Sequence, residues 1–191
     1  MKEITIRGEI QAARKNSGII MLGISSFVLA ISLSAQQPMK TSNWDSWQFL
    51  LGEWVGEGGG SGPGQGLGTS TFYLDLQNTI LVRKNQANYP ASKDRPAYSH
   101  DDLTIIYQQP DSTKAIYFDN EGHVIHYTAA FSEDHNTLIF VSEITQSAPR
   151  FRLTYTKVKE GTLKIKFEIA PPGKPEAFSQ YIEAVLHQKQ R

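Results

Sequence analysis

The sequence predicts an all-β protein: a closed antiparallel up-and-down barrel of about ten strands with a short N-terminal helix, preceded by a signal sequence. Three observations predict this fold. From residue 53 onward, apolar residues recur at every second position in short runs, as they do in β-strands. Turn residues separate these runs about every ten positions. No helical pattern lies between the runs, although a parallel sheet would need one.

Closure of the barrel follows from the number of strands. An open antiparallel meander would leave two unpaired edges, whereas a closed barrel has none. A two-sheet sandwich is the main alternative, but its crossing connections would need longer loops than most of those in this sequence.

The first element is a short helix. Trp47, Leu50 and Leu51 stand at positions i, i+3 and i+4, which places them on one helical face. Gly52 follows, and glycine is common just past a helix end. We expect one or two helical turns that close one end of the barrel.

The strands follow in chain order, starting from Glu53. Glycine-containing turns at Gly122 and Gly161 separate the clearest pairs of runs. Two longer segments, 56–68 and 89–100, are rich in glycine or contain two prolines, and we expect both to be loops at a barrel mouth. The remaining alternating or apolar runs are 73–76, 79–82, 103–107, 116–118, 125–131, 138–141, 151–155, 163–169 and 178–186.

The N-terminal segment has the order of a secretory signal. Two basic residues, Arg14 and Lys15, precede an uncharged run over 18–33, and Ser34 and Ala35 follow it. The run is shorter than the roughly 20 residues of a spanning helix. The prediction is therefore a signal peptide over 1–35, a flexible leader over 36–44 and a barrel over 45–191, in a secreted or periplasmic protein without membrane insertion after signal removal. An uncleaved N-terminal anchor is the alternative.

Composition excludes several classes of function. Residues 36–191 hold 15 basic and 17 acidic side chains, a net charge of −2, which offers no basic face to nucleic acid. The chain has no cysteine, which excludes disulfides, thiolate metal sites and thiol catalysis.

The residues after the helix resemble a known family. Gly52-Glu53-Trp54 resembles the Gly-x-Trp opening of lipocalin-like, or calycin, barrels, and the wider segment 49–58 is similar to the opening of uncharacterised bacterial lipocalin-like domains and of nitrobindin-like haem-binding barrels. The resemblance implies a structural role for Trp54, as a plug at the barrel floor. It also implies a haem-ligating position on the last strand. Tyr181 stands there in place of histidine, and tyrosine can ligate haem iron.

Most motifs of known chemistry are absent. The glycine-rich loop has neither a Gly-x-Gly-x-x-Gly register nor a following Gly-Lys, and Pro63 breaks a Gly-x-Ser-x-Gly spacing. His123 and His126 are three apart on a strand and would point to opposite faces, so we predict no metal site. The polar segment 99–102 is interpreted as a turn that caps the next strand.

A few residues remain as candidates for contacts with a ligand. Arg83 shares its strand parity with Leu81 and is predicted to point inward. We expect the polar contact with a ligand to come from Arg83, His126 or Tyr181, although His126 faces away from the apolar side of its own run. The expected apolar walls come from Tyr107, Tyr155 and Phe167.

The sequence thus predicts an exported barrel that binds a small apolar or amphipathic molecule, rather than an enzyme, with no cofactor and no metal. Two alternatives stay open. One is a haem-binding or enzymatic barrel, of isomerase or cyclase type, with His126 or Tyr181 in the pocket. The other is a structural barrel whose interior is filled by side chains.

Overall fold

The computed structural model describes residues 43–56 and 66–190. The predicted signal peptide, nearly all of the predicted leader and most of the glycine-rich segment lie outside the described residues, so the predictions for them stay predictions. Within the described part of the chain, no helix is long and apolar enough to cross a membrane.

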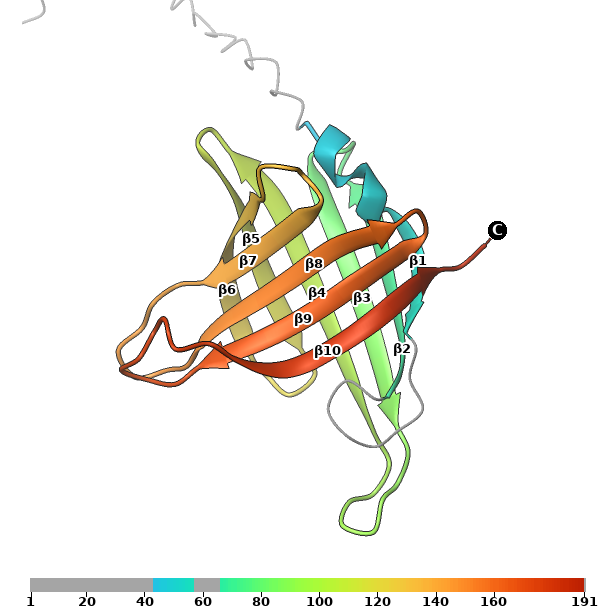
Figure 1. Cartoon of the computed structure of the whole chain (residues 1–191), viewed down its shortest axis with the longest axis vertical. Coiled ribbons are helices and arrows are strands. Elements are labelled where there is room, and N and C mark those ends of the chain that lie inside the picture. The colour runs from blue at the N-terminus through green and yellow to red at the C-terminus, as the bar shows by residue number, and fades with distance from the viewer. Residues whose placement is uncertain (1–42, 57–65, 191) are drawn as a thin grey trace, which may run out of the picture. The chain divides into compact units, whose positions relative to one another are not determined.

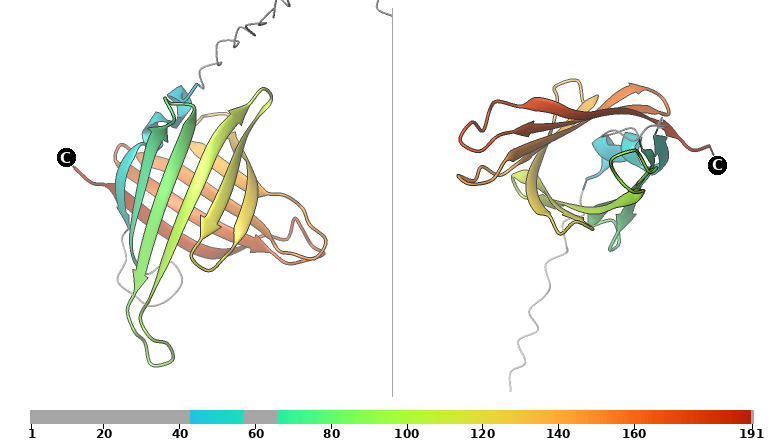
Figure 2. Two further views of the ribbon diagram at one scale, coloured as in Figure 1. Left: turned by 180° about the vertical axis from the view of Figure 1, so that it is seen from behind. Right: turned by 90° about the horizontal axis from the view of Figure 1, so that it is seen from below.

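Ten antiparallel strands form one closed barrel, in which each strand pairs with its neighbours in the sequence and β1 pairs with β10 (Figures 1 and 2). The predicted all-β closed up-and-down barrel is therefore confirmed. The strands are β1 (Gly52–Gly56), β2 (Leu67–Asp75), β3 (Ile80–Tyr89), β4 (Tyr98–Gln109), β5 (Ser112–Asp119), β6 (Val124–Phe131), β7 (Thr137–Ser142), β8 (Arg150–Lys159), β9 (Thr162–Ala170) and β10 (Ser179–Gln188).

The short helix η1 (Asp45–Leu50) closes one end of the barrel, as predicted, although it is a 3-10 helix (Figure 1). Trp47 and Leu50 are buried on its inner face. Gly52 carries the chain from the helix into β1 with a φ of 120°, and a Cβ there would lie 2.9 Å from the Gln188 side chain. Only glycine suits this backbone conformation without strain.

Aromatic side chains fill the half of the barrel next to η1. Trp54 is 2% exposed, and its Nε1–H donates to the Leu50 carbonyl at 2.7 Å, which ties β1 to the helix. Phe72 and Phe140 meet Tyr155 edge to face, with ring centroids 5.6 and 6.1 Å apart. Such packing buries large apolar areas and stabilises the closed end.

The other end of the barrel bears the longer connections. Strands β3 and β4 project beyond the rest of the barrel there (Figure 2). The predicted loop over 89–100 is too long, because β3 continues to Tyr89 and β4 begins at Tyr98. His100 and Asp102 consequently lie within a strand, and the interpretation of segment 99–102 as a turn is wrong.

Strand β4 presents its faces in the opposite sense to the one expected. Its buried inner residues are Asp102, Thr104 and Ile106, whereas Ile105 and Tyr107 stand on the outer face. The outer face is apolar because neighbouring strands carry apolar residues at the same register. Ile105 pairs with Val82 on one side and with Ile116 on the other.

Candidate functional site

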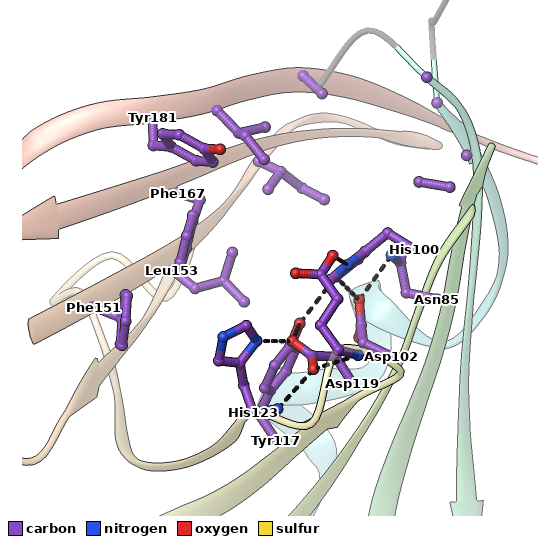
Figure 3. A pocket seen from close by; sticks show the side chains of 18 of the residues that line it. Asn85, His100, Asp102, Tyr117, Asp119, His123, Phe151, Leu153, Phe167 and Tyr181 are labelled. Atoms are coloured by element: carbon purple, nitrogen blue, oxygen red, sulfur yellow. Dashed lines mark hydrogen bonds and ion pairs between the residues drawn. The ribbon is translucent and has the colours of Figure 1, made fainter. Parts of the chain in front are cut away.

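The half of the barrel away from η1 encloses a cavity of about 490 Å³. Its two long walls differ in chemistry, as Figure 3 shows. One wall, from β3, β4, β5 and the turn after β5, carries polar groups: Arg83, Asn85, His100, Asp102, Tyr117 and Asp119. The facing wall, from β8, β9 and β10, is almost entirely apolar: Phe151, Leu153, Ile165, Phe167, Ile169, Tyr181, Ile182, Ala184 and Leu186. We call these the polar wall and the apolar wall.

Strand register creates the polar wall. Ser70, Asn85, Asp102 and Asp119 are direct cross-strand partners on β2, β3, β4 and β5, so their side chains point to the same face. Ser70 Oγ donates to Asn85 Oδ1 at 2.6 Å, and Asn85 Nδ2 donates to Asp102 Oδ2 at 2.9 Å. The result is a hydrogen-bonded row across β2, β3 and β4, with Asp119 of β5 next to it in register.

An ion pair lies at the deep end of this row. Arg83 Nη2 donates to Asp102 Oδ2 at 3.3 Å, and the two side chains are only 9% and 3% exposed. Burial raises the pKa of Asp102 above its usual value, and the Arg83 charge and the Asn85 hydrogen bond offset only part of that rise. Burial alone would lower the pKa of Arg83, but the Asp102 carboxylate and the neighbouring tyrosines together more than offset it. The guanidinium therefore stays charged.

Both members of the pair keep hydrogen-bonding capacity. Among the residues that the structure describes, Arg83 Nε and Asp102 Oδ1 have no hydrogen-bond partner. Buried polar atoms are nearly always bonded, so two such atoms in one ion pair are unusual and point to a ligand or solvent contact.

Three tyrosines surround the Arg83 guanidinium: Tyr117, Tyr127 and Tyr155. Burial raises the pKa of all three hydroxyls, that of Tyr155 to about 12. They are therefore neutral at ordinary pH and can donate as well as accept hydrogen bonds.

His100 links the polar wall to the mouth of the cavity. Its Nδ1 lies 3.0 Å from Glu121 Oε1, and its Nε2 lies 3.0 Å from the Tyr117 hydroxyl. That hydroxyl donates its only proton to Asp119 Oδ2 at 3.1 Å, so His100 Nε2 must be the donor toward it. His100 thus joins Glu121 at the mouth to Tyr117 and Asp119 of the polar wall.

Asp119 fixes the turn at the cavity mouth. Its Oδ1 accepts from the backbone amides of Glu121 and His123, and its Oδ2 accepts from His123 Nδ1 at 2.8 Å. Burial alone would raise the pKa of Asp119, but the bonds from His123 and Tyr117 hold it below its usual value. This carboxylate is thus ionised and fully hydrogen-bonded.

The apolar wall is built from stacked aromatic and branched side chains. Phe151 and Phe167 stack with ring centroids 5.8 Å apart, and Tyr181 meets Phe167 edge to face at 6.2 Å. A register shift between Gln180 and Ile182 turns Tyr181 toward the cavity rim beside Ile182. A ligand in the cavity would therefore meet hydrocarbon on this side.

The predicted site residues divide into three groups. Arg83, Phe167 and Tyr181 line the cavity. Tyr155 does not line it but lies buried beneath it, with its ring 6.0 Å from the Arg83 guanidinium carbon. Trp54 lies in the closed end, in keeping with a structural position.

Tyr107 and His126 do not lie at the cavity. Tyr107 shares the outer face of β4 with Ile105, and His126 is exposed beside Ile116 on the outer face. The physical reason is strand parity: Ile125 and Tyr127 point inward on β6, so His126 between them points outward.

Sequence reasoning missed most of the polar wall, namely Asn85, His100, Asp102, Tyr117 and Asp119. One signal was available. Arg83 and Asn85 share a parity on one run, which marks Asn85 as an inward polar residue once Arg83 is placed inside.

The residues present do not fit a buried haem. Tyr181, the candidate iron ligand, is 54% exposed at the cavity rim. Among the described residues, no three His, Asp or Glu side chains gather as metal ligands.

Comparison with known proteins supports the fold and no more. No protein-family model matches the chain, and no curated protein sequence does. Among solved structures, the chain is similar to the crystal structure of Rv2717c from M. tuberculosis, with a TM-score of 0.56 and 16% sequence identity, over 77% of this chain and 97% of that one. The two proteins therefore share a fold.

Proposed function

We propose that this protein is an exported, lipocalin-like barrel that binds a small amphipathic molecule in the cavity between the polar wall and the apolar wall. The observation that carries the proposal is a cavity of about 490 Å³, open at its mouth, with hydrogen-bonding groups on one side and hydrocarbon on the other. Small-molecule sites are concave and mostly apolar, with a few convergent polar groups. Cleavage after Ala35 is part of the proposal and rests on the sequence, and N-terminal sequencing of the exported protein tests it.

The distribution of aromatic side chains argues against a barrel filled throughout. Phe72, Phe140 and Tyr155 pack together in the half next to η1. In the other half, the rings of Phe151 and Phe167 stack on each other within the apolar wall. The cavity lies between these rings and Asp102.

Asp102 favours a second candidate function, acid–base catalysis on the bound molecule. A buried carboxyl with a raised pKa beside a cavity is typical of proton-transfer sites. Mass spectrometry of bound molecules before and after long incubation distinguishes the two: a carrier returns its ligand unchanged, and an enzyme returns a product.

Fluorescence titration with 1-aminoanthracene, a neutral dye that brightens in apolar surroundings, tests binding in the cavity. The Ala184→Trp substitution places an indole ring into the cavity from the apolar wall. Val185→Trp is its matched control, because the adjacent residue points to the other face of β10. We expect Ala184→Trp to weaken dye binding by at least about tenfold and Val185→Trp to change it by less than about twofold.

Equal binding by both variants and the unchanged protein would contradict the proposal, since the dye would then sit on the outer surface. Absence of dye binding to the unchanged protein would contradict it as well. Native mass spectrometry of protein from its own host provides a second test, in which a binding barrel carries a co-purified small molecule.

A further inference from the structure

We infer that the ligand of this cavity is uncharged and facially amphipathic: one long face of the molecule is hydrocarbon, and hydroxyl or similar groups are spread along the other. The inference rests on the proposed function and deepens it, because it specifies the class of molecule. It differs from a fatty-acid type of ligand, in which one polar head joins a long apolar tail.

Polar groups extend along the whole depth of the cavity. Arg83 lies deep, Asn85 and Asp102 lie one pleat nearer to the mouth, and His100 lies opposite Ala87 beyond them. The four steps along the strand from Arg83 to Ala87 span about 13 Å. A ligand therefore meets hydrogen-bonding groups on this side from the floor to the mouth (Figure 3).

The apolar wall covers the same range of depth. Leu153 and Ile165 lie deep, and Phe151 and Ile169 lie toward the mouth. The four steps from Ile165 to Ile169 again span about 13 Å. Of the nine residues in this wall, only Tyr181, at the rim, carries a polar atom in its side chain. The polarity of the cavity is thus divided lengthwise and not end to end.

The buried charges deep in the cavity are matched, because Asp102 pairs with Arg83 at 3.3 Å. Nearer the mouth, the Glu121 and Asp119 carboxylates lie 3.0 and 2.8 Å from imidazole nitrogens of His100 and His123. Arg95, the remaining charge among the described lining residues, is exposed at the mouth over the Tyr98 ring, 4.0 Å from its centroid.

A charged ligand would have to break one of these pairs or lose its own hydration without gaining a partner. Either costs several kcal/mol when the groups are buried, about 3–5 kcal/mol for a broken buried pair. An anionic head would compete with Asp102 for Arg83, and a cationic head would compete with Arg83 for Asp102. The pairing therefore favours an uncharged ligand.

The unpartnered atoms indicate which uncharged group fits. Asp102 Oδ1 needs a donor and Arg83 Nε needs an acceptor, and the described residues supply neither. A hydroxyl group does both. Asn85 on the same wall and the neutral Tyr127 hydroxyl on the neighbouring strand β6 offer further partners in the cavity lining.

Four probes separate the shapes and charges of possible ligands. Methyl cholate is uncharged and carries three hydroxyls on one face of a rigid hydrocarbon skeleton. Methyl lithocholate has the same skeleton with one hydroxyl. Decan-1-ol is uncharged and divided end to end, and decanoate is its anionic counterpart. Each is titrated against 1-aminoanthracene bound to the unchanged protein.

We expect methyl cholate to displace the dye at least about tenfold more strongly than the other three. Its advantage over methyl lithocholate is the sharpest result, because burial of apolar area alone would favour the less hydroxylated and more hydrophobic ester. The inference would be overturned if methyl lithocholate, decan-1-ol or decanoate bound more tightly than methyl cholate, or if methyl cholate did not displace the dye. In either case, binding of the dye itself would leave the proposed function standing. Failure of the dye itself to bind overturns the proposed function.

A charge variant tests the matched pairs directly. Asp102→Asn removes the partner of Arg83 and leaves the guanidinium charge unmatched beside the cavity. We expect this variant to bind decanoate at least about tenfold more tightly than the unchanged protein, with a smaller change for decan-1-ol. Asp101→Asn makes the same charge change on the outer face of β4 and is expected to leave decanoate binding unchanged.

Decanoate binding that stays equally weak in a folded Asp102→Asn protein would contradict the role given to charge. Far-ultraviolet circular dichroism and the urea midpoint show whether the variant folds. If it does not, the comparison of decan-1-ol with decanoate on the unchanged protein decides the question, since equal or tighter binding of the anion contradicts an uncharged ligand.

Discussion

At the scale of single residues, two buried carboxylates show how surroundings decide charge. Asp102 lies inside the barrel, where burial raises its pKa. Glu168 lies on the outer face of β9, where hydrogen bonds from Arg152 at 2.7 and 2.9 Å and an ion pair with Lys166 lower its pKa to about 2. The first is suited to a contact that changes with the ligand. The second is suited to holding strands together.

Glu168 makes the stability of the barrel depend on pH. Its pKa is about 2 in the folded protein and lies near the ordinary glutamate value in the unfolded chain. Its contribution is therefore complete above about pH 4.5 and is lost as the pH falls from there toward 2. We expect Glu168→Gln to lower the free energy of unfolding by about 1–3 kcal/mol at pH 7 and by much less at pH 3, measured by urea denaturation.

The control for this change is Glu183→Gln. Glu183 pairs with Lys164 at 2.8 Å, but both side chains are more than a third exposed. Such a surface pair contributes about 0–1 kcal/mol. A loss for Glu168→Gln that is no larger than this, or that does not shrink with falling pH, would contradict the account of Glu168.

Three consecutive residues of the β2–β3 turn, Leu76, Gln77 and Asn78, have a positive φ, which is strained for residues other than glycine. Leu76 has a φ of 47° and is 64% exposed, so its side chain gains little from packing. We expect Leu76→Gly to raise the free energy of unfolding by about 0.5–1 kcal/mol, because glycine adopts this conformation without steric cost. The change is measured as a shift of the urea midpoint.

Leu67→Gly is the matched comparison. Leu67 is 62% exposed but belongs to strand β2 and does not have a positive φ. Glycine there is expected to destabilise the protein by about 1 kcal/mol. Destabilisation by both substitutions would show that strain at Leu76 is not relieved by glycine.

At the scale of elements, helix η1 acts as the floor of the barrel. Trp47 is 4% exposed and meets Phe131 and Phe140 with ring centroids 5.2 and 6.1 Å apart. We expect Trp47→Ala to lower the free energy of unfolding by about 3–5 kcal/mol. The exposed neighbour Ser46 provides a control, since Ser46→Ala removes no buried contact.

The affinity of folded Trp47→Ala protein for 1-aminoanthracene shows whether η1 only closes the barrel or also shapes the cavity. Because Trp47 lies in the closed end and the dye cavity lies in the other half, this affinity is expected to stay within about twofold. A tenfold loss in protein that is still folded would mean that η1 shapes the cavity.

The strands and their closure could be predicted from the sequence because alternation and tight turns are local signals. Alternation shows that two sets of side chains face opposite ways, but not which set faces inward. On β8 and β9 the more apolar set is inside, as with Leu153 and Phe167, and prediction works. On β4 the polar Asp102 is inside and the apolar Ile105 outside, and prediction fails.

That reversal is a property of several strands together. Ile105 lies outside because Val82 and Ile116 flank it at the same register, and Asp102 lies inside because Asn85 and Asp119 do. Register between strands is set by tertiary packing, which no single run of residues encodes. The candidate site was therefore only partly predictable, through Arg83 and the apolar wall.

At the scale of the whole molecule, closure and cavity are linked. Residues far apart in the sequence complete the ring: the Lys189 amide donates to the Glu53 carbonyl at 2.8 Å, and Gln188 Nε2 donates to the Leu51 carbonyl at 3.0 Å. This seam brings the apolar wall of β8 to β10 across from the polar wall of β3 to β5. One half of the barrel is packed with aromatic rings, and the other half is hollow.

Methyl NMR during titration with 1-aminoanthracene tests this central claim most directly, because inward and outward methyl groups occur in one protein. Leu153, Ile165 and Ile182 line the cavity, and Ile105 and Ile116 lie on the outer face. Binding between the two walls predicts shifts at the first three and none at the last two. Shifts confined to Ile105 and Ile116, or none at all, would contradict it.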